Sequence, residues 1–259
     1  MPTTPSPETI LDHVKAQEND ILDLCGELVA IESPSPDANA TRRVLDRLTS
    51  ELDDLGYRYH LSKPGKSGGF LYARPAHRPR HRPSQLLLGH VDTVWPLGTL
   101  QSRPWTVEDG VARGPGVFDM KAGIVQILFA LRTVQDLDLD PPATPLVLIN
   151  SDEEIGSRES TSAIDRLSRV ASRAFVCEPG LGSSGAVKTA RKGLGKYTVT
   201  VDGRAAHAGL DPDGGASAIL EVSSVIQRLF DLTARERDIT GIVGTRGGGI
   251  QADGVAPWS

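Results

Sequence analysis

The sequence predicts an α/β fold in which helices cover both faces of a sheet, followed by a smaller α+β segment. Short apolar runs bounded by turns, such as Gln85 to Gly89 and Leu146 to Asn150, are typical of buried strands. Asp119 to Leu137 has the apolar spacing of a helix. Because strands and helices alternate along the chain, we expect a layered sheet.

The other elements are predicted from the same patterns. Helices are expected over Ile10 to Ile31, Thr41 to Leu55 and Ser160 to Val170, and strands over Phe70 to Ala73 and Arg173 to Cys177. Beyond about Ala186, the expected elements are a strand from Arg191 to Val201, a helix from Ala216 to Leu232 and a strand from Thr240 to Thr245.

Composition narrows the class of protein. At 259 residues, with 39% hydrophobic and 24% charged residues, the chain can bury a sizeable core and form two domains. A formal net charge of -5 gives no basis for nucleic-acid binding, and the basic run Arg78 to Arg82 is short and broken by proline.

Two cysteines, Cys25 and Cys177, do not make a disulfide framework. With no signal-peptide pattern over Met1 to Glu8 and no run long enough to span a bilayer, the expected location is the cytoplasm.

His90 and Asp92 follow the predicted strand Gln85 to Gly89. Alternate strand residues point to the same side, so both side chains would leave the sheet together. A carboxylate beside a ligand histidine can orient its ring and fix its tautomer. Taken alone, however, the pattern is more typical of a hydrogen-bonded structural histidine.

Asp119 follows the turn Gly114 to Gly116 and precedes a helical segment. Its local pattern favours an ordinary N-cap, whose carboxylate accepts backbone N–H groups. A carboxylate held at that point can also offer two oxygens to two cations.

Asp152, Glu153 and Glu154 are consecutive acids at the end of a predicted strand. Like charges at short range repel one another unless a cation or a shared proton relieves them. Because neighbouring side chains diverge, one glutamate can bind a metal while the other acts as a general base towards a bound water. A solvated acidic turn is the alternative.

Glu178 closes another short apolar run, Ala174 to Cys177. In open α/β sheets, reactive groups collect outside the carboxyl ends of the strands. The ordered series of histidine and carboxylate residues at such ends therefore predicts a hydrolase built around one or two divalent metals.

Five segments carry a recognisable pattern in order: Gly89 to Val94, Gly114 to Gly123, Asn150 to Ser157, Cys177 to Pro179 and Gly203 to Gly209. Together they resemble the M20 family of zinc-dependent peptidases and deacylases, and within it the glutamate carboxypeptidase subgroup. The resemblance runs from about Ile21 to about Gly248, and it implies a zinc-peptidase-like catalytic sheet.

The resemblance also implies roles for these residues. Asp119 would bridge two zinc ions, and His90 and Glu178 would complete one of the two sites. Glu154 would bind the second ion; cobalt and manganese are alternatives to zinc. Glu153 would take a proton from the bridging water and pass it to the leaving nitrogen, while a metal-activated hydroxide attacks the acyl carbon. Asp92 would steady His90.

His207 lies in a loop of small residues, where a solitary surface histidine usually has no role. In the family, the matching histidine sits on a lid domain, reaches the active site of a partner subunit in dimeric members and stabilises the oxyanion. By this resemblance, residues 1–185 would form the catalytic metal-binding domain and residues 186–259 an incomplete lid and dimerisation domain.

The chain departs from the family pattern after His207. Family members supply one more metal-binding histidine from a C-terminal segment, and no histidine follows His207 here, so the second metal site is expected to lack one ligand. From Gly249 onward the sequence does not match the family. We expect a truncated or frameshifted chain, whose strand edges and apolar faces would be left uncovered. A natural short form with another ligand is the alternative, although the unassigned histidines lack a matching context: His13, His60, His77 and His81.

The substrate is predicted less closely than the reaction. The segment Val94 to Leu100 resembles the glutamate carboxypeptidase subgroup, which favours release of a C-terminal acidic amino acid from an N-acyl or peptide substrate. Arg191 and Lys192 are candidates for binding a carboxylate, although a solvated pair is as consistent. An N-acyl-amino-acid deacylase of the acetylornithine or succinyl-diaminopimelate type is the alternative, and an inactive metal-binding fragment is the alternative of another class. The expected partners are a small-molecule substrate and a second copy of the chain, with no nucleic acid or membrane.

Overall fold

The computed structural model describes residues 5–244, except residues 80, 183, 190, 191, 194, 196, 208 and 238. The chain divides into two compact units, Met1–Val187 and Lys188–Ser259.

The first unit is built on a five-stranded mixed sheet with the order β1-β2-β6-β3-β7. Its strands are β1 (Tyr57–Leu61), β2 (Phe70–Pro75), β3 (Ser84–His90), β6 (Thr144–Asn150) and β7 (Ala171–Val176). Strand β3 runs parallel to β6 and β7, whereas β2 is antiparallel to β6 and to β1. Because β3, β6 and β7 are parallel, the residues that follow them emerge at one edge of the sheet.

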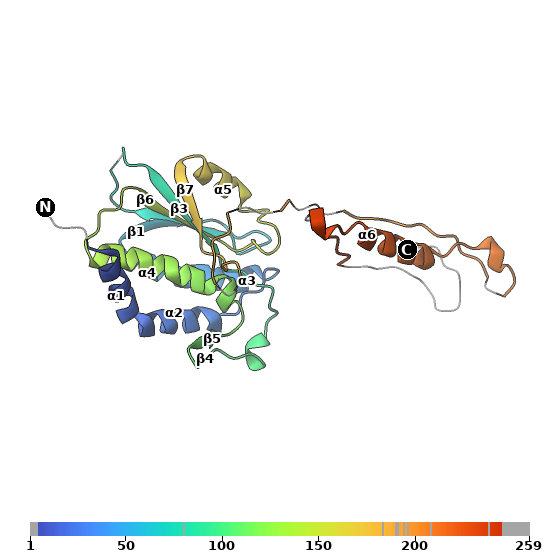
Figure 1. Ribbon diagram of the computed structural model, residues 1–259, viewed down its shortest axis with the longest axis horizontal. Coiled ribbons are helices and arrows are strands. Elements are labelled where there is room, and N and C mark those ends of the chain that lie inside the picture. The colour runs from blue at the N-terminus through green and yellow to red at the C-terminus, as the bar shows by residue number, and fades with distance from the viewer. Residues whose placement is uncertain are drawn as a thin grey trace. The chain divides into compact units, whose positions relative to one another are not determined.

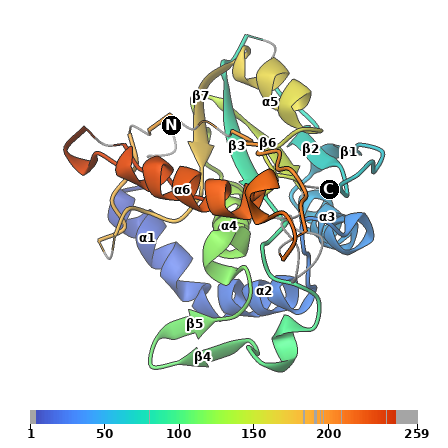
Figure 2. The same ribbon diagram turned by 90° about the vertical axis from the view of Figure 1, so that its right-hand side faces the viewer.

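Helices cover both faces of this sheet, as predicted (Figure 1). One face carries α1 (Pro7–Ala16), α2 (Glu18–Ala30), α3 (Ala38–Asp54) and α4 (Ala122–Asp136), and the other carries α5 (Thr161–Ser168). Figure 2 shows α4 beside α1 and α2.

The core follows the alternation of strand side chains. Val147 and Ile149 of β6 belong to the large cluster beneath α2, α3 and α4. Leu146 and Leu148 belong to a second cluster with residues of α5. Successive strand side chains point to opposite faces, so a strand buried along its whole length needs helices on both sides.

Several elements differ from the prediction. The helix expected over Ile10 to Ile31 is broken at Gln17 into α1 and α2, and neither glycine nor proline marks the break. Strand β1 and a two-stranded hairpin, β4 (Thr106–Glu108) and β5 (Val111–Arg113), were not predicted. Asp109 and Gly110 join the hairpin strands with φ values of 52 and 72 degrees, which a two-residue hairpin loop favours. Strands of three residues are too short to show a period.

In the second unit, α6 (Ala218–Asp231) matches the predicted helix and begins after Ser217, whose Oγ accepts a hydrogen bond from Leu220 N at 3.2 Å. The described residues of the two predicted strands form no ladder, and Tyr197 is 90% exposed. A strand needs a hydrogen-bonded neighbour, and among the described residues of this unit the pairing consists of isolated bridges, such as that between Arg204 and Ala216.

Short 3-10 turns occupy Thr99–Gln101, Pro212–Gly214 and Arg235–Arg237.

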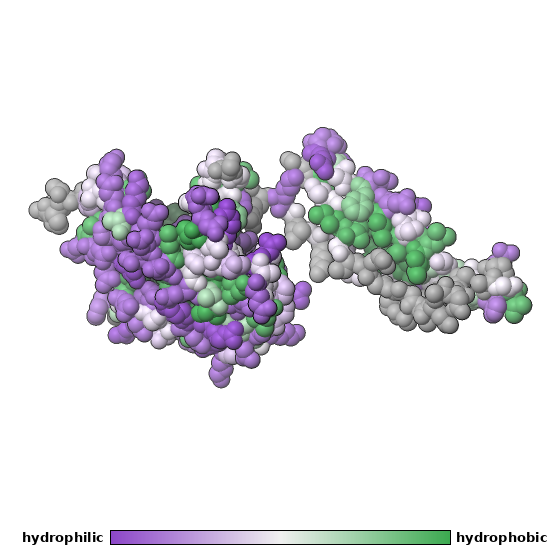
Figure 3. Space-filling model, turned by 90° about the horizontal axis from the view of Figure 1, so that it is seen from below, coloured by the Kyte–Doolittle hydropathy of each residue, from purple (hydrophilic) through white to green (hydrophobic). Residues whose placement is uncertain are grey.

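Figure 3 shows a hydrophobic area on the second unit, and α6 carries exposed Ile219, Leu220 and Phe230. Among the described helices, none has both the length and the apolar character needed to cross a membrane.

Candidate metal centre

Five side chains gather at the carboxyl edge of β3, β6 and β7. We call them the acidic cluster: His90, Asp119, Glu153, Glu154 and Glu178. Their ligand atoms form two triplets, in each of which all atoms lie within 4.8 Å of one another. One triplet is His90, Asp119 and Glu154, and the other is His90, Glu153 and Glu178. The structure thus brings together the predicted ligands and the predicted general base.

His90 is the centre of the cluster and is only 1% exposed. Its Nε2 lies 3.1 Å from Asp119 Oδ1 and 3.3 Å from Glu178 Oε1. Its Nδ1 lies 2.9 Å from the backbone oxygen of Asp92 and 3.4 Å from Asp92 Oδ1. When Nδ1–H donates to Asp92, the lone pair of the neutral ring is on Nε2 and faces the carboxylates.

The Asp92 carboxylate contacts both His90 and the turn that carries Glu153 and Glu154. It is fully buried, and its Oδ1 and Oδ2 accept hydrogen bonds from Glu153 N and Glu154 N, each at 3.1 Å. One carboxylate therefore joins the end of the His90 strand to the turn that carries both glutamates. The sequence pattern did not indicate this contact, because its partners lie far apart in the chain.

The side chain of Asp152 makes different contacts from those of the two glutamates that follow it. Its side chain is buried and accepts hydrogen bonds from Glu159 N at 2.7 Å and from Ser160 Oγ at 2.6 Å. The three consecutive acids thus divide into one that shapes the turn and two that belong to the cluster.

Asp119 is not an N-cap, which corrects the local interpretation of its sequence. It lies in a kinked turn, Val117–Lys121, where its φ and ψ of -126 and 101 degrees are not helical. The N-cap of α4 is Lys121, and it makes no side-chain capping bond. The Asp119 side chain is 51% exposed and reaches His90 instead. The structure thus places Asp119 beside His90, in the cluster where the family resemblance predicts a ligand.

The cluster perturbs the protonation of its own groups. Burial alone would lower the pKa of His90, but the side chains of Asp92 and Glu178 raise it to about 11. Burial raises the pKa of Asp119, and the charge of Glu178 raises it further.

The two glutamates are perturbed in the same direction. Burial raises the pKa of Glu153 and of Glu154, and His90 partly opposes both shifts. The neighbouring charge of Glu178 raises the pKa of Glu153, and that of Asp119 raises the pKa of Glu154. Negative charge is crowded here, and a divalent cation would relieve it.

The donor set fits a zinc-type ion, because an imidazole nitrogen and carboxylate oxygens are ligands that zinc accepts. A single imidazole nitrogen bonds one metal ion, and both triplets use His90. In the described residues, the cluster can therefore give a histidine ligand to one ion at a time.

His207 belongs to the second unit, Lys188–Ser259. Its Nδ1 accepts hydrogen bonds from Gly209 N at 3.1 Å and Leu210 N at 3.2 Å. In the neutral ring, the proton is then on Nε2, which is left as a hydrogen-bond donor. Of the possible carboxylate-binding pair, Arg191 lies outside the described residues.

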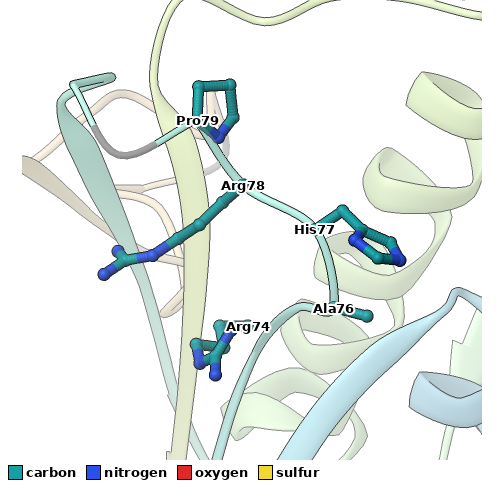
Figure 4. Close-up of a pocket in the computed structure, with 5 residues that line it drawn as sticks. All are labelled: Arg74, Ala76, His77, Arg78 and Pro79. Atoms are coloured by element: carbon teal, nitrogen blue, oxygen red, sulfur yellow. The ribbon is translucent and has the colours of Figure 1, made fainter.

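A hollow of about 680 Å³ lies on the first unit but is separate from the acidic cluster. It is lined by Arg74, Ala76, His77, Arg78 and Pro79 (Figure 4). These residues follow or end β2, which is antiparallel to β6, so they lie at the opposite end of the strands from His90. Figure 4 shows Arg78 and His77 extending to opposite sides of the loop.

The chain is similar in sequence to hydrolases of two kinds. The chain is 30% identical over 216 residues to carboxypeptidase G2 of Pseudomonas sp. (strain RS-16), covering 82% of this chain and 51% of that protein. It is 35% identical over 212 residues to succinyl-diaminopimelate desuccinylase of Rhodospirillum rubrum, covering 73% of this chain and 52% of that protein. The chain thus spans about half the length of these relatives.

Solved structures share the fold. A tripeptidase from Staphylococcus aureus matches with a TM-score of 0.66 and 20% identity, over 93% of this chain and 64% of that one. An M20 family metallo-carboxypeptidase from Sulfolobus solfataricus matches with a TM-score of 0.61 and 18% identity, over 82% of this chain and 50% of that one. The family model described as peptidase family M20/M25/M40 matches residues 86–255. The chain belongs to this family of metal-dependent peptidases and deacylases.

Proposed function

We propose that the chain carries the metal site of a hydrolase that cleaves an amide bond and releases a C-terminal acidic amino acid from an N-acyl or peptide substrate. The observation that carries the proposal is the meeting of one imidazole and four carboxylates at the carboxyl edge of three parallel strands. Such an edge is where open α/β sheets bind their ligands.

In this proposal, His90, Asp119, Glu154 and Glu178 hold zinc, with cobalt or manganese as alternatives. The bound ion would supply Lewis-acid polarisation of the scissile carbonyl and would lower the pKa of water. Asp92 occupies Nδ1 of His90, so that Nε2 stays directed at the carboxylates.

Glu153 is the general base of the proposed reaction. Partial burial and the charge of Glu178 raise its pKa, which favours a carboxylate that first accepts a proton and then returns it to the leaving nitrogen. His207 would donate from Nε2 to the oxyanion, because its Nδ1 is already engaged as an acceptor.

The names of the relatives support two substrate classes. The similarity to carboxypeptidase G2 supports release of a C-terminal amino acid. The sequence resemblance to the glutamate carboxypeptidase subgroup favours an acidic amino acid. The second candidate is an N-acyl-amino-acid deacylase, which is favoured by the identity of 35% to a succinyl-diaminopimelate desuccinylase.

We further propose that residues 186–259 are a lid and dimerisation domain in a cytoplasmic protein. The exposed apolar residues of α6, such as Leu220 and Phe230, support an interface. The free thiols of Cys25 and Cys177 are consistent with a reducing compartment.

The test is metal content per chain together with turnover of an N-acyl glutamate and of N-succinyl-diaminopimelate, with and without added zinc. Glu153→Gln is expected to lower kcat by about 10²- to 10⁴-fold while metal content stays the same, because it removes the proton acceptor only. Glu108→Gln, exposed on β4, is the matched control. A chain that holds metal but hydrolyses neither substrate would support the inactive metal-binding module instead.

A further inference from the structure

The backbone that carries Asp119 needs support from outside its own turn. Asp119 interrupts the helical geometry of Val117–Lys121, and half of its side chain is exposed. Packing around the carboxylate therefore cannot fix its position. A ligand held this way depends on how the residues beside it are anchored.

The two residues that follow Asp119 are both buried and both make contacts outside the turn. Met120 is fully buried, and its Sδ accepts a hydrogen bond from His90 N at 3.2 Å. Lys121 is 1% exposed, and its Nζ donates to Leu28 O at 2.9 Å and to Ile31 O at 2.8 Å.

The acceptors of Lys121 lie at the C-terminal end of α2. The last carbonyls of a helix lack partners within it, and the negative end of the helix dipole favours a cation. Among the described residues, Lys121 forms no salt bridge, and the nearby Glu32 carboxylate instead accepts from Gly98 N and Leu100 N. Backbone carbonyls are thus the groups that hold Nζ of Lys121.

The segment after α2, Ile31 to Ser35, is fixed in turn to the strand end that carries His90 and Asp92. Ser33 Oγ donates to Val91 O at 2.7 Å, and Thr93 N donates to Ser33 O at 2.9 Å. The same segment is therefore bonded to the His90–Asp92 strand end and, through Lys121, to the turn of Asp119.

We propose that Lys121 is a positioning residue for Asp119: its buried Nζ, through hydrogen bonds to Leu28 O and Ile31 O, ties the Asp119 turn to the end of α2 and so sets where the carboxylate lies against His90. This inference rests on the function proposed above for the acidic cluster. Lys121 touches no substrate and no reacting atom in this proposal.

The experiment compares Lys121→Met, Lys121→Gln and Leu48→Ala with the unaltered full chain. Methionine keeps an unbranched apolar stem without the Nζ donor, and glutamine keeps a shorter side chain that ends in an amide. Leu48→Ala weakens the core from α3, outside this set of contacts. One measurement is cobalt(II) affinity and visible absorption, and the other is amide hydrogen exchange over residues 117–121. Lys121 N, which donates to Gly116 O at 2.9 Å, reports on the turn.

We expect Lys121→Met to weaken cobalt binding by about 10- to 100-fold, to alter the absorption spectrum and to speed exchange within the turn. Leu48→Ala should lower global stability and leave cobalt affinity and spectrum unchanged. If Lys121→Met does not fold, Lys121→Gln carries the same comparison.

Unchanged cobalt affinity in a folded Lys121 variant would overturn the inference, and so would an equal loss in Leu48→Ala. If the unaltered chain bound no cobalt, the proposed function would fail. Hydrogen exchange would still decide on Lys121: faster exchange confined to residues 117–121 supports its anchoring role, and unchanged exchange there refutes it.

Discussion

At the scale of single residues, Asp92 joins parts of the centre that are distant in sequence. Its backbone oxygen and carboxylate face His90, and the same carboxylate accepts from two backbone N–H groups of the acidic turn. Asp92→Ala would leave those partly buried donors without this fully buried partner. We expect the free energy of unfolding to fall by about 1–3 kcal/mol, as is typical of buried unsatisfied groups.

The same variant should weaken zinc binding by about 10- to 100-fold, because His90 loses the group that orients its ring. Urea unfolding and zinc titration measure the two effects. The control is Asp46→Ala, which removes an exposed partner of Arg42 on α3. Equal effects of the two substitutions would contradict the role given to Asp92.

His90 also makes a pH dependence predictable. Its pKa in the metal-free fold is raised to about 11 from an ordinary value near 6.5. The stability that protonated His90 contributes is therefore fully present below about pH 6.5 and is lost as pH rises towards 11. A metal ion must displace this proton, so metal affinity should rise with pH across the same window.

Calorimetric titration with zinc in two buffers of different ionisation enthalpy, at pH 7 and pH 8, measures the protons released. We expect about one proton per ion from His90. An affinity that does not change with pH would show that His90 is already neutral or is not a ligand.

At the scale of elements, the start of α4 lies unusually close to the end of β7. A Cβ added to Gly123 would collide with the backbone oxygen of Cys177, the residue before Glu178. Glycine to alanine in a helix ordinarily stabilises by about 0.5–1 kcal/mol. Here we expect the opposite sign, a loss of about 1–3 kcal/mol from overpacking.

Denaturant unfolding of Gly123→Ala measures whether the free energy of unfolding falls or rises. Ala130→Gly, at an exposed position of the same helix, provides the reverse exchange without the collision. A stabilised Gly123→Ala protein would mean that α4 and β7 can separate without cost.

The same elements show what the sequence could predict. β3, β6 and β7 were found because each is an apolar run closed by a turn, and their ends located His90, Glu153 and Glu178. The geometry of Asp119 could not be found locally, because an aspartate before a helix has the same pattern whether it caps or not. The anchoring of the acidic turn by Asp92 and of the Asp119 turn by Lys121 depends on contacts between distant segments, which periodicity does not encode.

At the scale of the whole molecule, the chain separates proposed metal binding from proposed oxyanion stabilisation. The acidic cluster lies in Met1–Val187, and His207 lies in Lys188–Ser259. His207→Ala in the full chain is therefore expected to leave zinc affinity unchanged and, in zinc-dependent turnover, to lower kcat by about 10²- to 10³-fold.

Zinc titration and steady-state kinetics of this variant give the two readouts. His13→Ala is the control, since His13 forms a surface pair with Asp136. A loss of zinc affinity in His207→Ala would contradict the division of roles between the two units.

The parallel pairing of β3 with β6 and β7 has a consequence for how the protein folds. Leu88 pairs with Leu148 on one side and with Val176 on the other, so the centre is built from contacts between segments far apart in the chain. Such contacts form slowly, because long loops must close first. During synthesis, His90 and Asp119 leave the ribosome well before Glu178, and a metal ion meeting the nascent chain would find an open set of ligands until β7 had joined the sheet.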